Sequence, residues 1–144
     1  MSCKINFSLI TESLTGNIGD DWKYKVIADV FNPNLTGRGT ISVNEHTLTP
    51  GTSKAVPNNN IIRIPAGACA TGPTVKITIE AEEVDWLIDD DETNSLTIPM
   101  ECPGPGGNPY EIEETISVVV KEEPNIFGNN ATLEVIVRLV AECV

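Results

Sequence analysis

The stretch Thr74-Val75-Lys76-Ile77-Thr78-Ile79-Glu80-Ala81-Glu82 alternates between polar and apolar side chains, with the apolar ones at the odd positions. Successive side chains of a β-strand point to opposite faces, so this pattern predicts a strand with one buried face and one solvated face. The stretch from Leu133 to Glu142 repeats the alternation, while Ile136 and Val140 depart from it as expected of a two-sided central strand. Both stretches indicate an all-β fold.

The rest of the chain consists of short apolar runs separated by turns. Ten prolines and eleven glycines lie between runs rich in Val, Ile, Leu and Thr, a composition typical of many short strands and few helices. We expect a single domain, residues 1–144, folded as a two-sheet antiparallel β-sandwich of about eight strands. The predicted strands are Lys4 to Ile10, Trp22 to Phe31, Thr40 to Val43, Ile61 to Ile64, Thr74 to Val84, Ser95 to Pro99, Glu113 to Lys121 and Ala131 to Glu142.

The alternation of the Thr74 strand breaks after Ala81. Beyond this point Glu83 falls on the inner face, while Val84 and Trp86 fall on the outer face. An extra residue near Glu82 and Glu83 would restore both faces, so the sequence predicts a β-bulge there.

Carboxylates crowd the segment that follows. Between Glu80 and Glu92, eight of thirteen residues are acidic and none is basic. Such crowding is relieved by spreading the charges, by pairing them with Lys or Arg, or by binding a cation. Calcium suits the segment because it takes about six to eight oxygen ligands in flexible geometry. A second acidic pair, Asp20 and Asp21, precedes the strand at Trp22, and its oxygens would join the same site if both loops share one end of the sandwich.

The strand from Val75 that leads into Asp85-Trp86-Leu87-Ile88-Asp89-Asp90-Asp91 resembles the calcium loops of synaptotagmin-type sandwich modules. In that family, aspartates from loops at one end of an eight-stranded sandwich clamp calcium, often near a membrane or partner. The spacing of the aspartates departs from the usual family pattern, and the basic patch for lipid headgroups is missing. The resemblance implies calcium as the ligand and places Asp20, Asp21, Asp85, Asp89 and Asp91 at ligand positions, with Asp90 in the same run.

Two hypotheses for function follow from these features. The first is a non-catalytic calcium-binding module whose acidic loops bind the ion and dock a partner, either a protein or a carbohydrate. Trp22 and Trp86 lie beside the two acidic loops; packing or anchoring of the loops is the favoured role, and they are also the candidate partner contacts. The second is a structural or adhesion subunit of a filament, capsid or surface, a homo-oligomer in which the acidic loop is merely solvated. The first and last strands or the Pro103 to Pro109 loop would then make the contacts.

Charge and histidine content argue against other functions. The net charge of -12 disfavours nucleic acid and anionic membranes as partners, because both attract basic surfaces. His46 is the only histidine, and its setting of Asn44-Glu45-His46-Thr47 is typical of a polar turn. We therefore expect no catalytic site and no enzyme activity.

The four cysteines are Cys3, Cys69, Cys102 and Cys143, and no two of them form a CxxC pair, so a zinc site is not expected. Cys3 directly precedes the first predicted strand and Cys143 directly follows the last one, and the other two cysteines fall in turn-rich loops. Pairing stays open, since it depends on the compartment. The N-terminal residues alternate in polarity, unlike a signal peptide, and no run is long enough for a membrane helix. The default location is cytoplasmic, with export by another route open.

Overall fold

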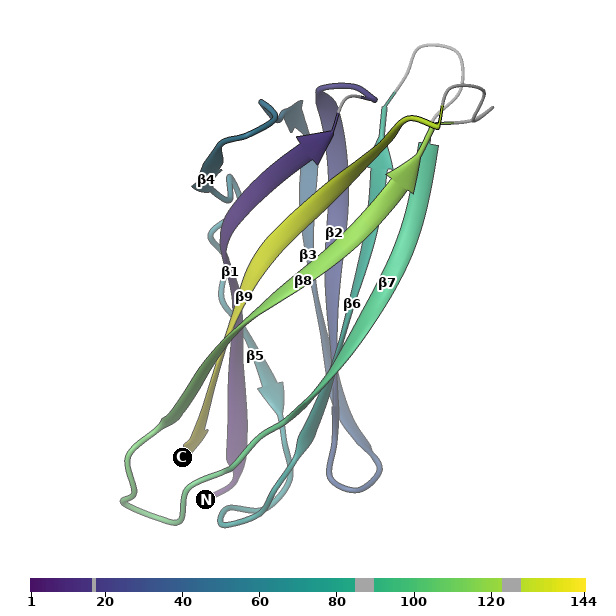
Figure 1. Ribbon diagram of the computed structural model, residues 1–144. Coiled ribbons are helices and arrows are strands. Elements are labelled where there is room, and N and C mark those ends of the chain that lie inside the picture. Colours follow the sequence, from purple (N-terminus) through teal and green to yellow (C-terminus); the bar gives the residue numbers. More distant parts are fainter. Residues whose placement is uncertain (17, 85–89, 123–127) are drawn as a thin grey trace.

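The computed structural model describes residues 1–16, 18–84, 90–122 and 128–144. These residues contain no helix, and thus none that is long and apolar enough to cross a membrane. They form strands in two antiparallel sheets packed face to face (Figure 1). The all-β sandwich predicted from the sequence is confirmed.

The two sheets contain nine strands in the described residues. The first sheet has the order β4-β1-β9-β8, with β5 also paired to β1, and the second has the order β3-β2-β6-β7. All eight predicted strands are present, and the additional one is the three-residue β4. The strands are β1 (Cys3–Gly16), β2 (Asp21–Phe31), β3 (Leu35–Thr47), β4 (Ser53–Ala55), β5 (Ile62–Pro65), β6 (Thr74–Glu83), β7 (Asp90–Pro99), β8 (Tyr110–Lys121) and β9 (Asn130–Cys143).

β4 and β5 pair with different stretches of the same strand, β1. Lys54 of β4 lies opposite Glu12, and Ile64 of β5 lies opposite Ile5. The two short strands therefore act as one interrupted edge strand. Counted in this way, the sandwich has about eight strand positions, as the sequence predicts.

The core lies between the sheets and follows the alternation seen in the sequence. The odd residues of β6 from Val75 to Ala81 are buried, and the intervening residues of the strand are more exposed. Ile77 and Ile79 lie opposite Ala28 and Val26 of β2 in the ladder. Because burial of apolar surface is the main favourable term in folding, this inner face fixes the register of β6.

The ladders contain bulges, although not where the sequence predicts one. β6 pairs without interruption through Glu83, on both of its sides. The predicted bulge near Glu82 and Glu83 is therefore wrong, and Glu83 stays on the inner face, where it is buried. Register shifts occur instead in β1, between Leu9 and Thr11, and in the β2–β3 ladder.

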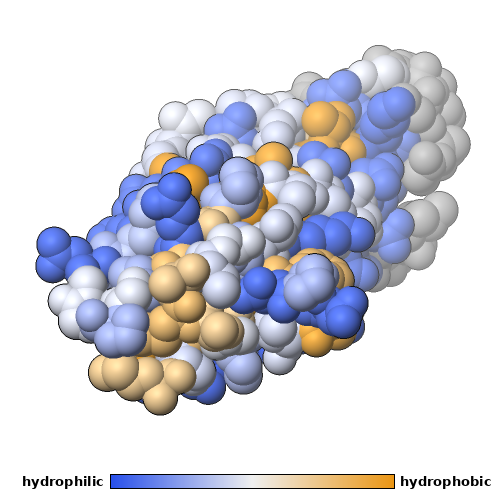
Figure 2. Space-filling view, turned by 90° about the horizontal axis from the view of Figure 1, so that it is seen from below, coloured by the Kyte–Doolittle hydropathy of each residue, from blue (hydrophilic) through white to orange (hydrophobic). Residues whose placement is uncertain are grey.

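Two disulfides close the end of the sandwich that carries the chain termini (Figure 1). Cys3 and Cys143 are neighbours in the β1–β9 ladder, but each is bonded to a loop cysteine, in the pairs Cys3–Cys102 and Cys69–Cys143. Viewed from this end, the surface mixes hydrophilic and weakly hydrophobic residues, with strong hydrophobic colour in small separate spots (Figure 2). The disulfides thus tie the connections before β6 and before β8 to the two central strands of the first sheet.

Candidate functional site

The two acidic segments lie at the same end of the sandwich, opposite the disulfides (Figure 1). The backbone N–H of Val84, which follows β6, donates a 2.8 Å hydrogen bond to the carbonyl of Asp21. One residue further along β2, Trp22 lies directly opposite Glu83. The carboxylates of the two acidic segments could reach one site only if both segments lie at one end of the sandwich. The β1–β2 and β6–β7 connections do lie at the same end.

Strand β3 fixes the position of the β1–β2 connection. The carbonyl of Asp20 accepts a 2.7 Å hydrogen bond from the backbone N–H of Leu48. The Oδ1 atom of Asp21 accepts a 3.3 Å hydrogen bond from the hydroxyl of Thr47. Asp20 and Asp21 are both exposed, so the connection is anchored beside the end of β3 while both side chains remain accessible to solvent.

The described part of the acidic segment is a β-hairpin rather than a loop. β7 begins at Asp90, and Glu83, Glu82 and Glu80 of β6 pair with Asp90, Asp91 and Thr93. The expectation that Asp90 and Asp91 belong to a loop is therefore wrong. Aspartate has low strand propensity, but here pairing with β6 determines the structure of this segment.

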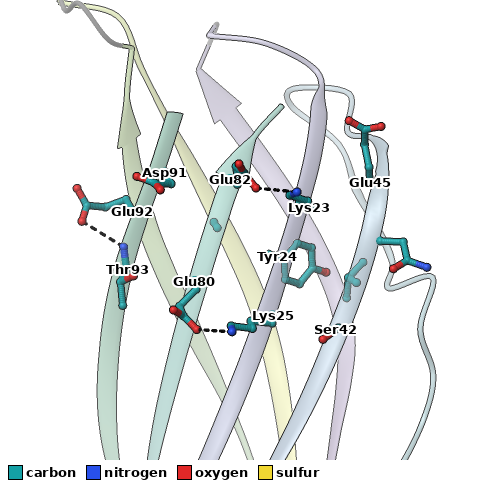
Figure 3. Close-up of a pocket in the computed structure, with 13 residues that line it drawn as sticks. Lys23, Tyr24, Lys25, Ser42, Glu45, Glu80, Glu82, Asp91, Glu92 and Thr93 are labelled. Carbon is teal, nitrogen blue, oxygen red and sulfur yellow. Dashed lines mark hydrogen bonds and ion pairs between the residues drawn. The ribbon is translucent and has the colours of Figure 1, made fainter. Parts of the chain in front are cut away.

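The outer face of this hairpin carries carboxylates that are paired with lysines of β2. Lys23 Nζ lies 3.0 Å from Glu82 Oε2, and Lys25 Nζ lies 3.2 Å from Glu80 Oε2 (Figure 3). These ion pairs border an open hollow of about 630 Å³ that also includes Asp91. Exposed pairs of this kind each contribute roughly 0 to 1 kcal/mol. The pairs nevertheless relieve part of the repulsion among the carboxylates. The lysines that form them come from β2, far from the acidic segment in sequence.

The inner face of the same hairpin carries two buried acids. Glu83 and Asp90 are only 4% and 3% exposed and lie directly opposite each other in the β6–β7 ladder. Gly19 of the β1–β2 connection packs against the Glu83 carboxylate, where a Cβ atom would collide with it. The indole N–H of Trp22 donates a 3.1 Å hydrogen bond to the Gly19 carbonyl. The interior at this end of the sandwich is therefore acidic, directly beneath the β1–β2 connection.

The structure divides the predicted metal ligands. Asp20 and Asp21 are exposed at the β1–β2 connection. Asp90 points inward and its neighbour Asp91 points outward, because adjacent strand residues face opposite sides. The predicted ligands Asp85 and Asp89, and the predicted partner contact Trp86, lie outside the described residues. Within the four described stretches, no group of three or more His, Cys, Asp or Glu side chains is arranged to hold a metal ion.

Trp22 is a core residue. Its side chain has no exposed surface, and its only polar atom is bonded to the Gly19 carbonyl. This burial corrects the expectation that Trp22 contacts a partner. Its position next to the Asp20–Asp21 pair instead makes it the packing anchor of the β1–β2 connection.

A second polar cluster, which the sequence analysis missed, joins the two sheets. Glu12 of β1 is 2% exposed, and its Oε1 accepts a 2.8 Å hydrogen bond from the hydroxyl of Tyr24 in β2. Its Oε2 lies 2.5 Å from Nε2 of His46, which is part of strand β3 and not of a turn. His46 Nδ1 lies 2.8 Å from the backbone carbonyl of Asn44. We call Glu12, Tyr24 and His46 the inter-sheet cluster.

Two register shifts, one in β1 and one in the β2–β3 ladder, direct this cluster into the interior. In β1 the inward positions are odd up to Leu9 and even from Glu12 onward, because the register shifts between Leu9 and Thr11. In β3 the side chains of Ile41 and Val43 point inward, and regular alternation would make residue 45 the next. The next inward side chain is instead that of His46, because the β2–β3 register shifts between Trp22 and Tyr24. The phase change from Leu9 to Leu14 is visible in the sequence, and it is the signal that could have placed Glu12 inside.

Burial and the neighbouring carboxylate also affect Tyr24. Its side chain is almost fully buried. Burial, followed by the charge of Glu12 and the hydrogen bond to it, raises the pKa of Tyr24 well above its usual range. The raised pKa favours the protonated hydroxyl, which is the form that donates to Glu12.

Comparison with known proteins gives no match to this chain, either among protein-family models or among curated protein sequences.

Proposed function

We propose that the chain is a non-catalytic calcium-binding β-sandwich module. The ion would bind at the end of the sandwich where the β1–β2 and β6–β7 connections meet, and the same loops would dock a partner. Asp20, Asp21, Asp90 and Asp91 are the ligand candidates among the described residues. Asp85 and Asp89 are candidates on the sequence alone.

The observation that carries this proposal is the shared position of the two acidic segments. They are separated by about sixty residues in sequence, yet the Val84 N–H bonds directly to the Asp21 carbonyl. Beneath them lie two buried acids, Glu83 and Asp90, which are directly opposite each other in the β6–β7 ladder. The carboxylates of Asp20 and Asp21 lie exposed above them, and carboxylate oxygens are the ligands that calcium prefers in proteins.

Two further features support the proposal. With β4 and β5 counted as one strand, the sandwich has the eight strand positions of the synaptotagmin-type modules that the acidic run resembles. The paired cysteines suit an oxidising compartment. Calcium modules outside the cell work with dissociation constants of about 0.1 to 1 mM, which a site with few pre-arranged ligands can reach.

The test is thermal unfolding in chelator, in calcium and in magnesium. An ion that binds only the folded state stabilises it by RT ln(1 + [L]/Kd), so about 10 mM calcium at a Kd of about 1 mM contributes about 1.4 kcal/mol. For a domain of this size we expect a rise in Tm of about 3 to 6 °C with calcium. A shift no larger than that in magnesium would refute the proposal.

Variants locate the site. Asp21→Asn and Asp90→Asn each remove one carboxylate at the proposed site and should remove most of the calcium-dependent shift. Glu101→Gln makes the same charge change at an exposed position in the β7–β8 connection, at the opposite end, and should leave the shift intact. Equal losses in all three variants would indicate nonspecific binding to an acidic surface. A large assembly that chelator does not dissociate would instead favour a structural or adhesion subunit.

A further inference from the structure

The inter-sheet cluster contains the only histidine of the chain. Both ring nitrogens of His46 face oxygen atoms that accept hydrogen bonds. Nδ1 lies 2.8 Å from the carbonyl oxygen of Asn44, which has no proton to give. Nε2 lies 2.5 Å from Oε2 of Glu12, and the other oxygen of that carboxylate already accepts from Tyr24.

The two contacts of His46 can both be hydrogen bonds only if enough protons are present. A neutral imidazole carries one N–H and a carboxylate carries none, so a neutral ring beside an ionised Glu12 can make only one of the two hydrogen bonds. Both contacts are made if the pair holds one more proton. That proton can sit on Nε2, giving an imidazolium and a carboxylate, or on Oε2, giving a neutral ring and a carboxylic acid. The requirement is the same in either case, because the proton belongs to the pair.

We propose that the inter-sheet cluster is a pH-sensitive lock, closed while the Glu12–His46 pair holds its shared proton and weakened when that proton leaves. The lock connects β1 of one sheet with β3 of the other. When the proton leaves, either Nε2 or Nδ1 presents a lone pair to an oxygen at hydrogen-bond distance, and one of the two bonds is lost. Tyr24 does not take part in the change, because its raised pKa keeps its hydroxyl protonated.

The charged neighbours of the pair are few. On β1 and β2 the polar groups facing it are Glu12 itself and Tyr24. Glu45 precedes His46 on β3 and is exposed, and Lys54 of β4 lies opposite Glu12 in the ladder and is also exposed. In β6, Glu83 lies beyond Trp22 from His46. The hollow beside His46 is bordered on its other side by uncharged residues, Pro57 and Asn58 to Asn60. Glu12 is therefore the one acid that contacts the ring among the described residues.

The lock is placed to affect the loop end of the sandwich. Thr47 and Leu48, the two residues after His46, donate the hydrogen bonds that hold Asp21 and Asp20. A weakened contact at His46 should therefore loosen the end of β3 and the β1–β2 connection together. This inference does not depend on calcium.

The single histidine allows a direct test by ¹⁵N NMR of the imidazole. In folded protein at neutral pH we expect both ring nitrogens to be close to hydrogen, either as two N–H groups or as one N–H and one nitrogen that accepts from Glu12. Unfolded protein provides the reference for a free ring. A folded ring with one N–H, a bare second nitrogen and the same pH dependence as in the unfolded chain would overturn the proposal.

Unfolding measurements as a function of pH give an independent readout. His46→Gln keeps a donor to Glu12 but cannot titrate, and Tyr24→Phe removes a bond to the same carboxylate without removing the titrating ring. A proton bound more tightly by the folded state stabilises it in acid, and this stabilisation is lost as the pH rises. The ratio of the folding constants of the native sequence and His46→Gln should fall by up to about tenfold per pH unit through the transition. Tyr24→Phe should show the same fall relative to His46→Gln. A ratio of folding constants that stays constant from about pH 5 to about pH 9 would refute the lock. If His46→Gln does not fold, the NMR experiment decides.

Discussion

At the scale of single residues, two glycines set how closely the sheets approach at one edge. Gly37 and Gly39 of β3 face β5, which belongs to the other sheet. A Cβ atom on Gly37 would lie 2.8 Å from Cγ2 of Ile64 and 3.0 Å from Cδ of Pro65, and one on Gly39 would lie 2.8 Å from Cγ2 of Ile62. Glycine is therefore required here because β5 side chains approach the β3 backbone closely, and not because of an unusual φ angle.

Gly37→Ala should accordingly destabilise the protein. Overpacking costs about 1 to 3 kcal/mol, and Ile64 is buried and so cannot easily move away. The reduced backbone entropy of alanine in the unfolded chain offsets about 0.5 to 1 kcal/mol. We expect urea unfolding to show a net loss of about 1 kcal/mol. Gly104→Ala is the matched control, because its Cβ would meet nothing closer than 3.9 Å. Equal stability of the two variants would show that the β3–β5 edge can open without cost.

The inter-sheet cluster shows which residue contacts a sequence conceals. Glu12 and His46 are separated by more than thirty positions and meet only because a bulge in each sheet changes which side chains point inward. One of these bulges leaves a trace, since apolar residues switch from odd to even positions between Leu9 and Leu14. The other leaves no comparable trace, because the residues around His46 are polar. The histidine could therefore not be placed before the fold was known.

At the scale of secondary-structure elements, alternation was a reliable guide where one face of a strand is buried and a poor one elsewhere. All predicted strands exist because each has an apolar face that must be covered. β4 was missed because Ser53-Lys54-Ala55 is exposed throughout. The start of β7 was missed because its residues from Asp90 to Asn94 are polar and follow the register of β6. Of the candidate metal ligands, the sequence could indicate the type and number of side chains but not the face on which each lies.

Disulfides join elements that the ladders leave apart. The Cys69–Cys143 bridge has a sequence separation of 74 and connects the β5–β6 loop with the last strand. Removing a bridge that closes so long a loop gives the unfolded chain more conformational freedom, which costs about 2 to 5 kcal/mol of stability. We expect the double variant Cys69→Ala, Cys143→Ala to lose this much in urea unfolding under non-reducing conditions. In reductant, the difference between the variant and the native sequence should nearly vanish.

A thiol count checks the premise of that experiment. All four cysteines are paired in the structure, so protein denatured without reductant should expose no reactive thiol. Detection of four thiols per chain would mean that the pairing does not form. The stability difference between variant and native sequence would then measure only the loss of side-chain packing.

At the scale of the whole molecule, the two ends of the sandwich are stabilised by different chemistry. The end with the termini has long Gly- and Pro-rich connections, and covalent bonds hold them. The other end has the buried acids Glu12, Glu83 and Asp90, and the partly buried ring of His46 contacts Glu12. Apart from Asp29, which is paired with Arg38, these three acids are the buried charged residues of the described chain. Buried polar groups are costly unless they are satisfied, so conditions such as ions and pH should act mainly at this end.

The excess of acidic residues gives the last prediction. Acidic residues outnumber basic ones by 21 to 9, and the net charge of -12 opposes the compact state through self-repulsion. Salt screens this repulsion, so raising NaCl should increase stability by about 1 kcal/mol, the scale of exposed charge interactions.

The control is the same salt series near the isoelectric point of about 4.3, where the net charge is close to zero and the increase should disappear. A salt response that is equal at both pH values would show that salt acts on apolar burial and not on the net charge. A decrease at neutral pH would show that the surface ion pairs, such as Lys23–Glu82, outweigh the repulsion.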